Sequence, residues 1–134
     1  MAKIEDIEGV GRKYGQKLRD MGIGSVGKLL EEGSTRKARN AMAKELDISP
    51  KLILEWVNHA DLYRVKGIGS EYSDLLEEAG VDSVKELAKR KPEHLAEAIR
   101  EINDRKKLVR RACGVKTCES WITQAKGLPR AVHH

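Results

Sequence analysis

The stretch Ile7-Glu8-Gly9-Val10-Gly11 returns 58 positions later as Val65-Lys66-Gly67-Ile68-Gly69, and the correspondence runs without a gap for about two dozen residues. The identical positions are those where turn formation and core spacing matter most. In the first copy they are Gly9, Gly11, Tyr14, Leu18, Gly22, Ser25, Val26 and Leu29. In the second copy they are Gly67, Gly69, Tyr72, Leu76, Gly80, Ser83, Val84 and Leu87. The sequence therefore predicts a duplicated supersecondary unit.

A second correspondence lies further along the chain, at a different offset. Trp56-Val57-Asn58-His59-Ala60 resembles Trp121-Ile122-Thr123-Gln124-Ala125, which predicts that each unit ends in a similar helix. The first of these helices should start at Pro50 with Ser49 as its N-cap. Both tryptophans fall on apolar stripes of helical spacing, so we expect them to be core residues.

Apolar residues have helical spacing throughout, and alternating β-branched runs are missing, so the predicted fold class is all-α. We expect two units of about five short helices each, over 1–61 and 62–128, followed by a tail over 129–134. In the first unit the pattern predicts a helical turn at 4–7, a helix at 12–21, and helices starting near Val26, Thr35 and Pro50. The expected caps and stops are Ser25, Ser34, Ser49 and Gly33 there, and a Ser83–Glu86 capping box, a Pro92 start, and Gly80, Gly114 and Gly127 in the second unit.

Composition permits a polyanionic partner without requiring one. The chain carries 26 basic and 21 acidic side chains, a net charge of +5. Residues 1–61 hold a net charge of +1 and residues 62–134 a net charge of +4. No apolar stretch is long enough for a membrane span, and the first residues, Met-Ala-Lys-Ile-Glu-Asp, lack the layout of a secretory signal. We therefore expect a cytoplasmic protein with no membrane partner.

The two glycine pentapeptides, each followed by an amphipathic helix, resemble the helix-hairpin-helix motif. The glycines permit positive φ and close approach, and Val10 or Ile68 between them should plug the hairpin into its own core. A loop that leads into a helix N-terminus points free amides at one small volume, which suits an anion. The resemblance implies that these amides hold DNA backbone without reading bases. It assigns this role to Gly9, Val10 and Gly11 and to Gly67, Ile68 and Gly69.

Charge around the two loops differs. Arg12, Lys13, Lys17 and Arg19 are expected to surround the first helix start and to add contacts to phosphate. The second loop offers only Lys66 and Ser70. Its helix also carries acidic groups that would repel phosphate unless they face away from it, namely Glu71, Asp74, Glu77 and Glu78.

A cationic run lies further along the second unit. Its five cations are Arg105, Lys106, Lys107, Arg110 and Arg111. With Lys85, Lys89, Arg90 and Lys91 they could form a basic stripe. The alternative is that Leu108, Val109 and Ala112 bury one helix face and the cations are its solvated face, and the sequence favours neither.

Other patterns carry little functional weight. Gly22-Ile23-Gly24-Ser25-Val26-Gly27-Lys28 fits glycine-rich phosphate loops, but no strand precedes it and Leu29 stands where magnesium needs a hydroxyl. Cys113 and Cys118 have no second cysteine pair and no nearby histidine, so we expect reduced thiols and no metal. No catalytic arrangement stands out, and we expect no enzyme, cofactor or small-molecule substrate.

The whole arrangement, two hairpin units each ending in a Trp-x-x-x-Ala helix, resembles the bacterial family catalogued as domain of unknown function 4332 over about residues 4–128. That resemblance implies the fold and carries no catalytic residues. Two functions remain open at this point. One is a sequence-independent DNA-binding module whose partner is duplex backbone, and the other is a protein–protein scaffold whose hairpins are only structural.

Overall fold

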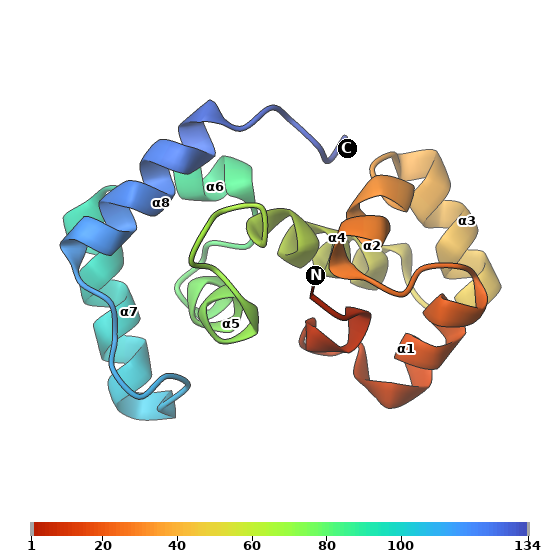
Figure 1. Cartoon of the computed structure of the whole chain (residues 1–134), viewed down its shortest axis with the longest axis horizontal. Helices are drawn as coiled ribbons and strands as arrows, with labels where there is room; N and C mark the ends of the chain where they lie inside the picture. The colour runs from red at the N-terminus through yellow and green to blue at the C-terminus, as the bar shows by residue number, and fades with distance from the viewer. Residues whose placement is uncertain (1, 134) are drawn as a thin grey trace. The chain divides into compact units, whose positions relative to one another are not determined.

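The computed structural model describes residues 2–133, so Met1 and His134, the last residue of the expected tail, lie outside the described residues. Within that range the regular elements are a short 3-10 helix and eight α-helices, together with one isolated bridge between Lys3 and Ser25 (Figure 1). The all-α fold class is confirmed. No helix in the described range is both long and apolar enough to cross a membrane.

The chain divides into two compact units, one formed by Met1–Asp61 with Arg130–His134 and the other by Leu62–Pro129. The helices of the first unit are η1 (Ile4–Asp6), α1 (Gly11–Asp20), α2 (Val26–Glu32), α3 (Arg36–Leu46) and α4 (Pro50–Leu62), whose last residue enters the second unit. The helices of the second unit are α5 (Ser70–Glu78), α6 (Val84–Ala88), α7 (Pro92–Lys106) and α8 (Val115–Gly127).

The described part of the second unit has four helices of its own rather than about five. In the first unit the helical turn expected before the glycine loop is η1, which packs against α1 and α2. The matching place before the second loop is taken by the last turn of α4, because Leu62 stands 58 positions after Ile4. A separate turn is therefore unnecessary there.

Helix starts in the first unit follow the expected capping chemistry with one exception. Ser25 Oγ accepts a hydrogen bond from Lys28 N at 3.1 Å, as a serine N-cap should. Ser49 Oγ likewise accepts from the backbone of α4, at Lys51 N. The cap of α3 is Thr35 and not Ser34, since Thr35 Oγ1 accepts from Ala38 N at 3.2 Å.

Two expectations for the second unit are corrected. Ser83 caps α6 as expected, with Oγ accepting from Glu86 N, but the reciprocal half of the capping box is missing. The Glu86 carboxylate instead accepts from Arg90 Nη2, one helical turn further on, at 3.0 Å. Gly114 does not stop a helix. It is the N-cap of α8, and α7 already ends at Lys106, where the next residue, Lys107, has the left-handed conformation.

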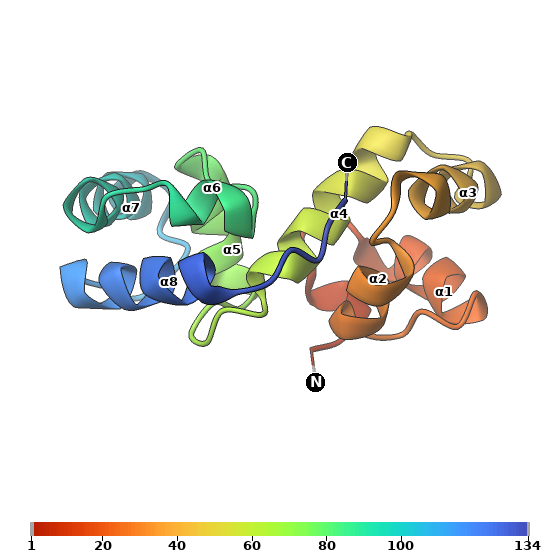
Figure 2. The same cartoon turned by 90° about the horizontal axis from the view of Figure 1, so that it is seen from above.

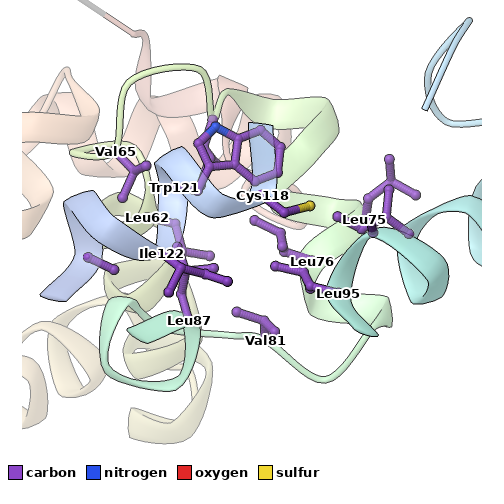
Figure 3. Close-up of a cluster of buried hydrophobic side chains, with 14 of the residues drawn as sticks. Leu62, Val65, Leu75, Leu76, Val81, Leu87, Leu95, Cys118, Trp121 and Ile122 are labelled. Atoms are coloured by element: carbon purple, nitrogen blue, oxygen red, sulfur yellow. The ribbon is translucent and has the colours of Figure 1, made fainter. Parts of the chain in front are cut away.

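Each unit buries its own apolar residues. In the second unit, α8 packs against α6 and α7 (Figures 1 and 2). Residues from these helices, from α5 and from the end of α4 make one apolar cluster around Trp121 (Figure 3). Trp56 and Trp121 are each only 2% exposed, so the expectation that both tryptophans are core residues is confirmed.

The end of the described chain is tied to the first unit. Val132 is buried, and His133 N donates to Ser34 O at 2.8 Å. The buried Arg39 guanidinium donates to His133 O and also to Gly33 O, at the C-terminal end of α2. Because burial and the charge of nearby Arg36 disfavour a cation here, the pKa of Arg39 is lowered, and the two carbonyl groups offset part of that cost.

Candidate nucleic-acid interface

The two glycine hairpins have closely similar backbones. The first glycine of each has a positive φ, 91° at Gly9 and 99° at Gly67. The apolar residue that follows is buried and donates its N–H back across the loop, Val10 to Ile7 O and Ile68 to Val65 O, both at 3.2 Å. Val10 and Ile68 therefore plug the hairpins into the core as expected.

The second glycines differ from each other. Gly11 has a φ of 66°, which favours glycine, and it opens α1. Gly69 has a φ of −118° and is the N-cap of α5, a conformation that any residue can adopt. The expected need for positive φ thus holds at three of the four hairpin glycines and is wrong at Gly69.

A tryptophan lies directly against the first glycine of each hairpin. A Cβ placed on Gly9 would lie 3.5 Å from Trp56 Nε1, and one placed on Gly67 would lie 2.9 Å from Trp121 Nε1. The indole nitrogen of Trp121 is seen beside the loop that follows Val65 in Figure 3. A tyrosine from the helix after each hairpin completes the arrangement. The ring centroids lie 5.7 Å apart for Tyr14 and Trp56 and 5.1 Å apart for Tyr72 and Trp121.

The helices that follow the hairpins start without side-chain caps. Val10 and Gly69 provide no side-chain cap, as is also the case at α7 and α8, whereas serine or threonine side chains cap α2, α3 and α6. The first N–H groups of an α-helix have no partner inside the helix. At α1 and α5 these donors, together with the positive end of the helix dipole, are therefore available to an anion.

Cations surround the first of these starts. Arg12 and Lys13 are the second and third residues of α1, and both side chains are exposed. Lys17 is also exposed, and its ammonium group lies 5.6 Å from the centroid of the Tyr14 ring. Glu8, exposed in the same loop, is the one acidic side chain among residues 7–13. The local charge of this hairpin is therefore positive.

Arg19 does not belong to this group, which corrects the expectation that it helps to surround the helix start. Its guanidinium donates twice to the Glu5 carboxylate, from Nε to Oε2 at 3.0 Å and from Nη2 to Oε1 at 2.6 Å. The hydrogen bonds from Arg19 lower the pKa of Glu5 to about 2. Gly15 makes this possible, because a Cβ there would lie 2.6 Å from Glu5 Oε2.

The second hairpin has a hollow that an acidic residue helps to line. An open hollow of about 290 Å³ at the start of α5 is lined by Gly69, Ser70, Glu71 and Tyr72. This is the place where the free amides of α5 would receive an anion. Glu71 thus belongs to the lining of this hollow, and a negative charge at this helix start opposes phosphate binding.

Lys66 has a partner that sequence reasoning missed. The side-chain amide of Gln124 accepts from Lys66 N at 2.9 Å and donates to Lys66 O at 3.4 Å, so the loop backbone is held from α8. Gln124 lies one helical turn after Trp121, on the face that supports the hairpin. The three-residue spacing between Trp121 and Gln124 is the only sign of this contact in the sequence. The Lys66 side chain remains exposed.

The cations of the 105–111 run do not lie along one helix face. Arg105 and Lys106 end α7, Lys107 is the left-handed residue after it, and Arg110 and Arg111 lie in the connection to α8. All five are exposed, and Lys106 Nζ lies 2.9 Å from Glu78 Oε1.

A buried amide shapes the connection that carries Arg110 and Arg111. Asn103 Nδ2 donates to Val109 O at 3.0 Å, and Asn103 Oδ1 accepts from Val109 N at 2.9 Å. These two hydrogen bonds hold Val109 in the core. Burial of Val109 was expected from the interpretation in which the cations of the 105–111 run are only a solvated face. Arg90 is not available for a wider basic stripe, because its guanidinium donates to Gly80 O and to Glu86.

The remaining sequence patterns have structural explanations. In the glycine-rich stretch 22–28, Ile23 is buried, Ser25 caps α2, and Lys28 forms ion pairs with Glu32 at 3.2 Å and Glu31 at 3.9 Å. Among residues 2–133, no three histidine, cysteine or acidic side chains lie close enough together to hold a metal ion.

The contact between tryptophan and glycine can be tested by a matched pair of substitutions. Gly67→Ala places a methyl group 2.9 Å from Trp121 Nε1 at a φ of 99°, and we expect it to lower the free energy of unfolding by about 1–3 kcal/mol. Gly69→Ala meets nothing within 4 Å at an ordinary φ and should cost less than about 1 kcal/mol, the loss expected because alanine is a poorer N-cap than glycine. Urea unfolding measures both. Equal losses would contradict this role of the indole.

The ion pair between Glu5 and Arg19 predicts an acid-dependent contribution to stability. The pKa of Glu5 is about 2 in the folded chain against an ordinary value of 4.5, so the pair stabilises the fold fully above pH 4.5. That contribution is lost as the pH falls from 4.5 through 2. We expect the thermal midpoint of the native chain to exceed that of Glu5→Gln at pH 6, and the difference to shrink towards pH 2. A difference that is constant over this range would refute the assignment.

Comparison with known proteins identifies the family. No curated protein and no solved structure matches the chain. The family model described as Domain of unknown function (DUF4332) matches residues 8–128. This range includes the glycines of both hairpins and the helices α4 and α8, which contain Trp56 and Trp121. The chain therefore belongs to the DUF4332 family.

Proposed function

We propose that this protein is a non-enzymatic module that attaches to the backbone of duplex DNA without regard to sequence, mainly through the first hairpin. One observation carries the proposal: the uncapped start of α1 opens next to the exposed cations Arg12 and Lys13. Free amides and a helix dipole favour an anion at this point, and the two side chains add charge-assisted contacts. Phosphate oxygens meet all of these requirements.

The proposal assigns a secondary role to the second hairpin. Its backbone presents the same kind of uncapped helix start, but Ser70 and Glu71 stand where the first hairpin has Arg12 and Lys13. Glu71 is among the residues that line the hollow, and its negative charge disfavours a phosphate there. Any DNA contact from this half then depends on Lys66 and on the exposed Arg110 and Arg111.

Glu71 is also the observation that favours the alternative function, a protein–protein scaffold whose hairpins only build the fold. An acidic residue in the lining of this hollow suits a cationic partner group better than phosphate. Both alternatives are compatible with a cytoplasmic location, which remains part of the proposal. They differ in one measurable respect, which is salt-dependent affinity for DNA.

The affinity for DNA should depend strongly on salt. With about three phosphate contacts, the affinity for duplex DNA should fall about 40-fold between 50 and 200 mM monovalent salt. Two unrelated duplexes of equal length should bind equally well, since backbone contacts carry no base information. Fluorescence anisotropy with labelled duplexes measures both. If the chain does not bind at 50 mM salt, the DNA proposal fails and the scaffold alternative gains support.

A further test exchanges the charges of the two hairpins. Arg12→Ser with Lys13→Glu gives the first hairpin the residues of the second, and we expect DNA affinity to fall about tenfold or more and the salt dependence to weaken by about two phosphate contacts. Ser70→Arg with Glu71→Lys gives the second hairpin the residues of the first. This variant should bind DNA more tightly than the native chain.

The control for this exchange keeps the change in net charge and moves its position. Lys37→Ser with Lys44→Glu alters two exposed lysines of α3 and removes the same three units of positive charge as the first variant. The proposal requires this control to weaken binding clearly less. If it weakens binding as strongly, affinity depends on overall charge and the first hairpin is not the contact.

A further inference from the structure

Two thiols meet in the second unit, away from the hairpin loops. Cys113 lies in the connection between α7 and α8, next to the N-cap of α8, and Cys118 lies in the first turns of that helix. Their sulfur atoms are 3.9 Å apart. Cys118 is fully buried in the apolar cluster, where Figure 3 shows its side chain, whereas Cys113 is partly exposed. One thiol is therefore within reach of solvent and the other lies behind it.

The packing of the unit does not require cysteine at these positions. Helix α4 spans Pro50–Leu62 and helix α8 spans Val115–Gly127, so the two helices have the same length and their bounds differ by 65 positions at both ends. At the same offset, Cys113 and Cys118 correspond to Ile48 and Ile53. The first unit therefore fills the equivalent positions with aliphatic side chains, of which Ile53 is fully buried. At these two positions the second unit differs from the first in having reactive thiol groups in place of aliphatic side chains.

The surroundings divide the two thiols into a nucleophile and its partner. A hydrogen bond from the Cys118 thiol, with smaller help from backbone and from Tyr72, lowers the pKa of Cys113 below its ordinary value of 9.0. The same interaction, together with burial, raises the pKa of Cys118. A thiolate is the reactive form of cysteine, and a position beside a helix N-terminus favours it further. Cys113 is thus the more accessible thiol and the one that ionises more readily.

We propose that Cys113 and Cys118 form a dithiol that peroxide converts into an intramolecular disulfide. The Cys113 thiolate attacks one oxygen of hydrogen peroxide, the O–O bond breaks, and, with one proton taken up, Cys113 sulfenic acid and water result. Cys118 then attacks the Cys113 sulfur, a second water leaves with the proton of Cys118, and the S–S bond forms. In balance, two thiols and one peroxide give one disulfide and two waters.

The required movement is small and falls on a loop residue. A disulfide has sulfur atoms about 2.05 Å apart, so the pair must close by about 2 Å from its present separation. Cys118 is fixed in α8, while Cys113 precedes the helix. The connection is otherwise attached at Val109 by Asn103 and at Arg111 O by the Tyr72 hydroxyl, at 3.2 Å. The bond would fix its remaining end, two residues after Arg111.

Titration with one equivalent of hydrogen peroxide tests the proposal on the full chain. We expect both free thiols to disappear together, the intact mass to fall by two hydrogens, and non-reducing electrophoresis to show a monomer. Peptide mapping should then recover a link between Cys113 and Cys118, and dithiothreitol should restore both thiols. Two thiols that remain free, a disulfide-linked dimer, or a Cys113 sulfinic acid beside a free Cys118 would each overturn the proposal.

Two single variants separate the roles of the thiols. In Cys118→Ala no resolving thiol is present, so peroxide should leave a Cys113 sulfenic acid that dimedone traps. In Cys113→Ala the buried Cys118 should react with neither peroxide nor dimedone while the chain remains folded by circular dichroism. If Cys118 reacts as fast as Cys113 does in its own variant, the division into attacking and resolving thiol is wrong. The result on the native chain decides the proposal even where a variant fails to fold.

Discussion

A tryptophan indole against the first glycine of a hairpin is the contact on which the rest of each unit depends. The indole nitrogen of Trp121 occupies the space that a Cβ on Gly67 would need, whereas Trp56 lies at ordinary contact distance from the position of a Cβ on Gly9. With no Cβ present, the loop can approach the tryptophan helix and turn through positive φ. The next residue then enters the core, and the following helix starts with its amides directed away from it.

This constraint determines the backbone of the hairpins and leaves their charge free to vary. Both copies keep the glycine, the buried plug and the tyrosine that packs on the indole. Outside the core, Arg12 and Lys13 in one copy are replaced by Ser70 and Glu71 in the other. Core packing tolerates either set, because exposed side chains at a helix start contribute little to stability. The difference between the copies is therefore best explained by what each surface contacts.

Local features of the fold could be predicted from the sequence. Ser25 and Ser83 as caps, Pro50 and Pro92 as helix starts, and the two buried tryptophans all follow from spacing and capping chemistry that act within a few residues. The predicted N-cap of α3, Ser34, was wrong by one residue. Ser34 and Thr35 are adjacent and both suit an N-cap, and the structure uses Thr35.

Contacts between residues far apart in the chain could not be predicted. Arg19 is taken by Glu5, 14 positions away, and Lys66 is held by Gln124, 58 positions away. Neither pair leaves a local pattern. The sequence could not decide between the two interpretations of the cationic run at 105–111 for the same reason. The course of the chain there depends on Asn103, which holds Val109 in the core. The charge available to each hairpin thus became clear only from the structure.

The central claim is that backbone amides of the first hairpin contact phosphate, and an NMR titration of the ¹⁵N-labelled chain with duplex DNA tests it most directly. The account predicts that the amide signals of Gly11, Arg12 and Lys13 shift most in the first unit, with smaller changes at Ser70 and Glu71, and that added salt reverses them. If DNA shifts signals elsewhere while those three amides stay unchanged, the hairpin is not the contact and the account is wrong.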